Sequence, residues 1–209
     1  MLKRLLLPLL LLGTPLAADA RLPLAPTAPG VFPVPVPAVA ADHPLRNRVA
    51  IEPVAGMPRR VGSWLHPITN PAEFDAALRQ TFRDTAMLAE AGAAPRARLV
   101  VTWREIDAPV RIGAGSRATV LIGYELRRID TGATIFQREI RTHSSSRGGD
   151  ASERLKANAR AAILANIASA TLCLQRAAVA STPDDCAIDI QGRMSWGGRV
   201  PLHRPLRRR

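Results

Sequence analysis

The centre of the fold is encoded by the stretch ATVLIGYELRRIDTGATIFQREIRT, residues 118–142. Its first half places apolar side chains at every second position, which is the period of a strand with one buried face. These side chains are Ala118, Val120, Ile122, Tyr124 and Leu126. Asp130-Thr131-Gly132 then predicts a compact turn, where glycine accepts a positive φ at little cost. Because the chain continues as a second strand over 133–142, we predict an antiparallel hairpin here.

A helix is predicted upstream of this hairpin, beginning at Asn70-Pro71-Ala72-Glu73. Asn70 is suited to cap the first turn, Pro71 fits the first helical position, and Glu73 is placed to reach back in a capping box. One apolar face follows, formed by Phe74, Leu78, Phe82 and Ala86. Gly92 and Pro95 are expected to end this helix.

Two further strands are predicted over 48–54 and 97–107, and the segment between the first strand and the helix is expected to be a loop. After the hairpin, residues 144–149 are expected to form another loop. A long, alanine-rich amphipathic helix then runs from Asp150 to about Leu174. The predicted order is β-α-β-β-β-α. We read this as an α+β fold with a single four-stranded sheet and two helices packed on one face.

Composition changes along the chain divide it into four parts. Residues 1–20 resemble a secretion signal, with Lys3 and Arg4 before a short apolar run and a small-x-small pattern ending at Ala20. We expect cleavage near Ala20 and export to the periplasm. Residues 21–46 form a proline-rich linker, residues 47–177 an α+β domain, and residues 178–209 a basic, flexible tail. No later stretch is expected to span a membrane.

The chain has a formal net charge of +12. Without residues 1–20 it keeps 27 basic and 16 acidic residues, and Lys156 is then its one lysine. An arginine-rich exported protein is suited to phosphate and carboxylate groups, whereas export argues against nucleic acid as a partner. For most of these arginines, coding bias in a GC-rich genome is the favoured explanation.

The two cysteines of the chain, Cys173 and Cys186, are a possible disulfide, because an oxidising compartment permits them to pair. Two free thiols are the alternative. No metal site is predicted from this pair, since the cysteines are widely spaced and no histidine lies between them.

We identify no catalytic residues, no cofactor-binding residues and no metal ligands in the sequence. The nearest candidate is His143 beside Ser144, Ser145 and Ser146, but neighbouring residues on a strand point to opposite faces. No glycine-rich phosphate-binding or dinucleotide-binding motif is present. We therefore expect a non-enzymatic protein.

The sharpest functional feature is the end of the chain. Its candidate contacts to anions or lipids are Arg193, Trp196, Arg199, Arg204, Arg207, Arg208 and Arg209. Such a mixture suits an anionic membrane or lipopolysaccharide, while a solvated tail without a ligand remains the alternative. Trp64, in a predicted loop, is a second candidate contact residue, whereas Trp103 on a strand is expected in the core.

Residues 47–175 resemble small envelope proteins of the YajG type and the auxiliary lipoproteins of ABC-type lipid transporters. The resemblance rests on the opening strand Val49-Ala50-Ile51, the helix at Phe74-Asp75-Ala76-Ala77-Leu78, the turn at Asp130-Thr131-Gly132 and the closing helix Asn158 to Ile167. It implies a non-enzymatic accessory role near the outer membrane, in envelope assembly or transport. Our first hypothesis is that the uncovered face of the sheet or an edge strand binds an unidentified protein partner by strand addition. The chain departs from these families because it lacks a lipobox cysteine. An anionic lipid or lipopolysaccharide binder acting through the tail is the alternative function.

Overall fold

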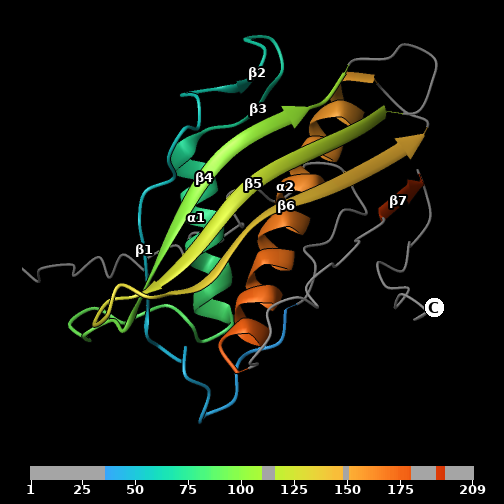
Figure 1. The fold of residues 1–209 in the computed structure, drawn as a ribbon. Helices are drawn as coiled ribbons and strands as arrows, with labels where there is room; N and C mark the ends of the chain where they lie inside the picture. The colour runs from blue at the N-terminus through green and yellow to red at the C-terminus, as the bar shows by residue number, and fades with distance from the viewer. Residues whose placement is uncertain (1–35, 110–115, 148–150, 180–191, 196–209) are drawn as a thin grey trace, which may run out of the picture.

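The computed structural model describes residues 36–109, 116–147, 151–179 and 192–195. Two helices and seven strands lie in these ranges (Figure 1). In chain order they are β1 (Val49–Ile51), β2 (Val61–Gly62), β3 (Pro67–Thr69), α1 (Pro71–Asp84), β4 (Ala97–Asp107), β5 (Ser116–Arg128), β6 (Thr134–Arg147), α2 (Ala151–Ala177) and β7 (Gly192–Ser195).

The main sheet has the strand order β1-β4-β5-β6-β7. Strands β4, β5 and β6 are antiparallel, whereas β1 lies parallel to β4 and β7 lies parallel to β6. The four predicted strands and the α+β class are therefore confirmed. The short strand β7 adds a fifth member from the segment that the sequence assigned to the tail.

The central hairpin is confirmed in detail. Gly132 adopts a φ of +70° in the turn, and the N–H of Arg128 donates to the carbonyl of Ala133 at 2.8 Å. The predicted loop after residue 143 was wrong, because β6 continues to Arg147 and pairs with the start of β5 through Ser116. Ser144, Ser145 and Ser146 extend the strand because they pair with the first residues of β5.

Helix α1 begins as predicted and ends earlier than predicted. The Asn70 side chain accepts a hydrogen bond from the N–H of Glu73 at 3.0 Å. The helix ends at Asp84, well before Gly92, because the chain turns at Ala86 with a φ of +56°. From there Met87 accepts a hydrogen bond from the N–H of Val49, so the backbone runs along β1 instead of continuing the helix.

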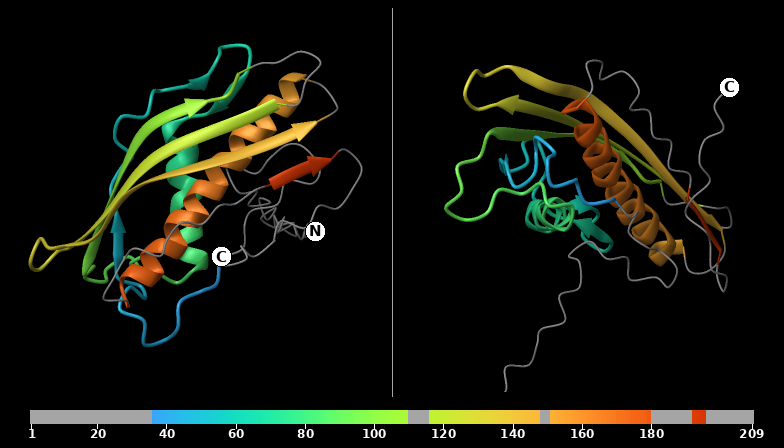
Figure 2. Two further views of the ribbon diagram at one scale, coloured as in Figure 1. Left: turned by 45° about the vertical axis from the view of Figure 1, so that its right-hand side comes forward. Right: turned by 90° about the horizontal axis from the view of Figure 1, so that it is seen from below.

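Both helices pack on the same face of the main sheet, as predicted (Figure 2). α2 crosses β5 and β6, and α1 lies beside it under β4. The buried side of the sheet supplies Trp103, whose ring meets that of Phe74 edge-on with centroids 5.8 Å apart. The largest fully buried side chains are Tyr124, Phe74, Phe82, Phe136, Leu78, Met87, Leu99, Ile122, Leu126, Ile163 and Ile167.

By length and mean hydropathy, α2 meets the criterion for a membrane-spanning helix, contrary to our expectation for the sequence. However, 83% of its most apolar window is buried inside the protein. Alanine-rich core helices meet the same criterion because both of their sides are covered by protein. The core position of α2 thus accounts for its apolar character.

The last part of the predicted proline-rich linker packs onto the domain. Val39 and Leu45 are buried in the core, and the N–H of Val39 donates to the carbonyl of Thr85. The imidazole of His43 lies 3.0 Å from the carbonyl oxygen of Gln175 at the end of α2. The folded unit therefore begins before residue 47.

Candidate functional site

The candidate residues predicted from the sequence are only partly described by the structure. Arg193 lies on β7, and the six other residues of the tail cluster (Trp196, Arg199, Arg204, Arg207, Arg208 and Arg209) lie outside the described residues. Cys173 is buried on α2, while Cys186 also lies outside them, so their disulfide stays a prediction.

The strand separates His143 from the serine next to it. His143 is half-buried on β6, whereas Ser144 is buried on the face that meets α2, where its hydroxyl donates to Asn158 Oδ1 at 3.3 Å. Ser145 is exposed. In the described ranges, no group of three or more His, Cys, Asp or Glu side chains could hold a metal ion.

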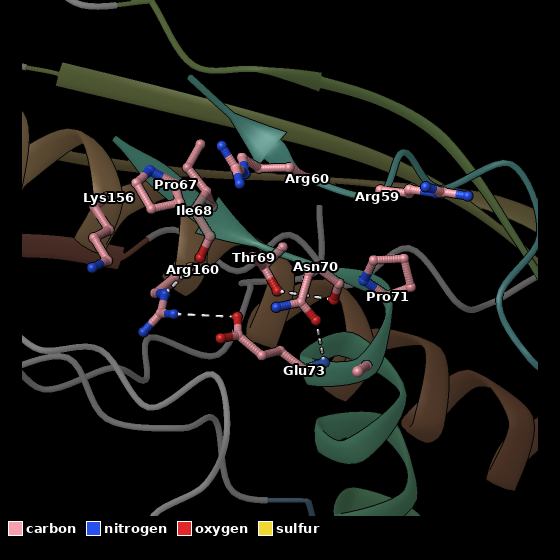
Figure 3. Close-up of a pocket in the computed structure, with 11 residues that line it drawn as sticks. Arg59, Arg60, Pro67, Ile68, Thr69, Asn70, Pro71, Glu73, Lys156 and Arg160 are labelled. Carbon is pink, nitrogen blue, oxygen red and sulfur yellow. Dashed lines mark hydrogen bonds and ion pairs between the residues drawn. The ribbon is translucent and has the colours of Figure 1, made fainter. Parts of the chain in front are cut away.

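A pocket of about 540 Å³ opens where the β2–β3 hairpin meets the start of α1 and one side of α2 (Figure 3). The residues that line it come from three separate stretches of sequence. They are Arg59, Arg60, Pro67, Ile68, Thr69, Asn70, Pro71, Ala72, Glu73, Lys156 and Arg160. We call this cavity the basic pocket, because four of its side chains are cationic and Glu73 is its one acidic residue.

Arg160 ties the walls of the basic pocket together. Its Nε–H donates to the carbonyl oxygen of Ile68 at 2.8 Å, and its terminal nitrogen lies 3.4 Å from Glu73 Oε2. The Arg160 side chain is only 11% exposed. Glu73 thus faces Arg160 from the first turn of α1 and is not seen to close the predicted capping box. A buried guanidinium with a carbonyl and a carboxylate partner is a structural element of the site.

The other cations are spread around the opening. Arg59 and Arg60 are exposed in the segment that leads into β2, and Lys156 is half-buried on the first turns of α2. Figure 3 shows Arg59 near Pro71 on one side, Lys156 on the opposite side, and Arg60 between them. The positive charges therefore surround the mouth instead of converging on one point.

The β2–β3 hairpin that forms one wall also carries an apolar tip. Trp64 is 77% exposed and Leu65 is 61% exposed. The tip is shaped by a hydrogen bond from the N–H of His66 to Ser63 Oγ at 3.0 Å and by Gly62, whose φ is +94°. The exposure of Trp64 agrees with its predicted place in a connecting segment, although that segment contains two short strands.

This arrangement suits the binding of negative charge better than bond making. Arginine and lysine are the side chains that recognise phosphate and carboxylate groups. Among the described residues that line the basic pocket there is no histidine, cysteine or serine. Away from the basic pocket, burial raises the pKa of the Tyr124 hydroxyl, which lies between β5 and α2.

Sequence reasoning missed the basic pocket because its cations are far apart in the chain. Arg59 and Arg60 stand almost a hundred residues before Lys156 and Arg160, and arginine is common throughout the sequence. One local feature of the sequence could have pointed to the basic pocket. The Arg59-Arg60 pair lies four residues before Trp64-Leu65 in a segment without helical periodicity.

The sequence matches no family model and no curated protein. Among solved structures, a Xanthomonas campestris protein of the DUF330 family has a TM-score of 0.48 and 13% identity, covering 66% of this chain and 89% of its own. A candidate lipoprotein of Caulobacter crescentus has a TM-score of 0.37 and 12% identity, covering 48% and 80%. A hypothetical protein of Chlamydia trachomatis has a TM-score of 0.36 and 14% identity, covering 46% and 72%.

None of these three descriptions names a YajG-type protein, so that part of the resemblance stays a prediction. The scores mark partial likeness of fold.

Proposed function

We propose that this chain is an exported, non-enzymatic envelope protein that binds an anionic group in the basic pocket. The observation that carries the proposal is the charge of the lining, in which four cations meet the single carboxylate of Glu73. Arg160 already engages that carboxylate. Arg59, Arg60 and Lys156 then provide an excess of positive charge at the mouth.

Export is supported by the leader-like residues 1–20 and fits this chemistry, because envelopes are rich in phosphate and carboxylate groups. A binding role is supported by the cations of the lining and by Thr69, whose hydroxyl donates to the carbonyl oxygen of Asn70 at 3.4 Å. The arginine-rich tail, which the sequence predicts to contact anionic lipid, is a surface separate from the basic pocket. The test below distinguishes binding by the pocket from binding by the tail.

The test is a titration of the full exported chain with inorganic pyrophosphate, followed by calorimetry and by NMR shifts of backbone amides. We expect binding that weakens strongly in the double variant Arg60→Gln/Lys156→Gln. The matched control is Arg98→Gln/Arg104→Gln, which removes two exposed cations of the main sheet that pair with Glu52 and Glu139. Equal binding by the pocket variant and the unaltered chain would refute the proposal.

A second candidate function, the binding of a protein partner by strand addition, is favoured by the outer edge of β6. Over Thr134–His143 this edge has no strand partner among the described residues, since β7 pairs only with Ser144–Arg147. The backbone there offers hydrogen bonds to an added strand. The carbonyl of Ile140 is already engaged, because Asn166 Nδ2 donates to it at 2.7 Å.

A photo-crosslinking residue placed at Gln137 in living cells tests this second function. We expect one adduct of defined mass from Gln137, which is exposed on β6, and none from a control position at Arg83, which is exposed at the end of α1. The same adducts from both positions would mean that the edge has no specific partner.

A further inference from the structure

We infer that the β2–β3 hairpin docks onto an anionic lipid bilayer, with Trp64 and Leu65 in the interface and the cations of the basic pocket on lipid phosphates. This inference rests on the proposed function, because it names the anionic group as a lipid headgroup. It assigns the role to a surface far in sequence from the arginine-rich tail.

The apolar half of the surface is the hairpin tip. Trp64 and Leu65 are adjacent, and they are two of the four large hydrophobic residues that the described part of the chain exposes. The others, Ile129 and Val179, lie singly at the β5–β6 turn and after α2. Tryptophan prefers the level of lipid headgroups, and leucine gains from burial in the acyl region. A tip of this composition is typical of insertion into a membrane interface.

The cationic half lies at the base of the hairpin. Arg59 and Arg60 precede β2 in the chain, and Lys156 lines the same cavity from α2. Figure 3 shows that these charges point to different sides of the opening. Such spacing lets the same cations that hold one anion also face a layer of headgroups, in which several phosphates lie side by side.

The hairpin is held in position, so docking needs little ordering. Val61 and Ile68 are buried, Val61 pairs with Thr69, and Arg160 bonds the carbonyl of Ile68 from α2. The tip thus projects from a fixed base at the end of the molecule where α2 begins (Figure 1). A preorganised tip loses less conformational entropy on binding.

A bilayer fits this surface better than a folded protein partner. Two exposed apolar side chains form too small a patch for a stable protein interface, which buries roughly 1,200–2,000 Å². Insertion of one or two side chains combined with a few cations is, by contrast, sufficient for reversible membrane binding.

The test is flotation of the full exported chain with vesicles of phosphatidylglycerol and phosphatidylcholine, and with vesicles of phosphatidylcholine alone. We expect salt-sensitive binding to the anionic vesicles only. Trp64→Ser/Leu65→Ser should weaken it by at least about tenfold while pyrophosphate binding persists. Arg59→Gln/Arg60→Gln should weaken vesicle binding by about fivefold per residue. The matched control, Ile129→Ser, also removes an exposed apolar side chain and should bind as the unaltered chain does.

A second measurement follows Trp64 directly. In a Trp196→Phe chain, Trp64 is the exposed tryptophan, since Trp103 is buried. Lipids brominated in their acyl chains should quench its fluorescence in anionic vesicles. The same chain with Trp64→Phe should show little quenching.

The outcomes separate the two proposals. Pyrophosphate binding without flotation, or equal flotation of the hairpin variant and the unaltered chain, overturns the inference and leaves the proposed function standing. Full flotation of the hairpin variant would assign lipid binding to the tail. If the hairpin variant loses both activities, quenching of Trp64 in the Trp196→Phe chain supports the inference, and the absence of that quenching overturns it. Failure of the unaltered chain to bind pyrophosphate overturns the proposed function itself.

Discussion

The hydroxyl of Tyr124 donates a hydrogen bond to Asn166 Oδ1 at 2.9 Å in the buried interface between β5 and α2. The amide nitrogen of Asn166 donates in turn to the carbonyl of Ile140 and to Thr142 Oγ1. These bonds fix α2 at one position along a sheet face that is otherwise apolar, because any slip would leave buried polar groups without partners.

Replacement of either partner should therefore destabilise the fold. We expect Tyr124→Phe to lower the free energy of unfolding by about 1–2 kcal/mol and Asn166→Ala by about 2–4 kcal/mol, since Asn166 serves more partners. Urea unfolding of both single variants and the double variant gives the coupling between them. A coupling near zero would show that the bond contributes nothing to stability.

The burial of the Tyr124 hydroxyl also predicts how the stability of the fold depends on pH in alkaline solution. Burial raises the pKa of its hydroxyl in the folded chain, whereas the unfolded chain should ionise it near pH 10. Below that value both states hold the proton. As the pH rises above it, only the unfolded state releases the proton, so stability falls.

Tyr124 is the single tyrosine of the chain, so tyrosinate absorbance reports this residue alone. We expect no absorbance step near pH 10 while the chain remains folded, and a step in urea. Unfolding curves between pH 8 and 11 should converge for the unaltered chain and Tyr124→Phe as the pH rises. An ordinary titration in the folded chain would contradict the burial of this hydroxyl.

The elements that local chemistry determines were predictable from the sequence. The Asn70-Pro71 helix start and the Asp130-Thr131-Gly132 turn require only near neighbours, and both occur as predicted. The end of α1 was not predictable, because Met87 leaves the helical path to bond β1, a contact across about forty residues. Strand β7 was missed for the same reason, since its partner β6 is distant in sequence.

Of the candidate site, only the exposed tryptophan could be predicted from the sequence. The Trp64 position indicated a contact surface, but nothing local connects Arg60 with Lys156. An arginine-rich composition hides such a cluster, because arginines also form exposed pairs elsewhere, such as Arg104 with Glu139. Folding brings the relevant cations together only through the packing of the β2–β3 hairpin against α2.

Arg160 should be more important for stability than the exposed arginines. Arg160→Met removes the hydrogen bond to the carbonyl of Ile68 and leaves Glu73 without this cation. We expect a loss of about 1.5–3 kcal/mol in the free energy of unfolding. Arg104→Gln, which breaks an exposed pair with Glu139, should cost no more than about 1 kcal/mol. If Arg160→Met and Arg104→Gln lower the free energy of unfolding equally in urea, Arg160 has no special role in stability.

Gly62 should control the shape of the hairpin tip. It adopts a φ of +94°, and a Cβ at this position would lie 2.5 Å from the carbonyl oxygen of His66, so Gly62→Ala must move the backbone. Gly132→Ala is the matched control, because Gly132 has a φ of +70° and a Cβ there would meet no atom within 4 Å. The control should cost only about 1–2 kcal/mol, which is the strain of a left-handed residue.

We expect Gly62→Ala to speed hydrogen exchange of the amides in 61–69 and to weaken binding to anionic vesicles, while the rest of the domain stays protected. The reason is that β2 and β3 form a separate two-stranded sheet, so their distortion need not spread into the main sheet. Gly132→Ala should leave both readouts unchanged, because its turn joins β5 to β6 away from the tip. If Gly62→Ala preserves exchange and vesicle binding, the tip does not depend on the close approach of Gly62 to His66.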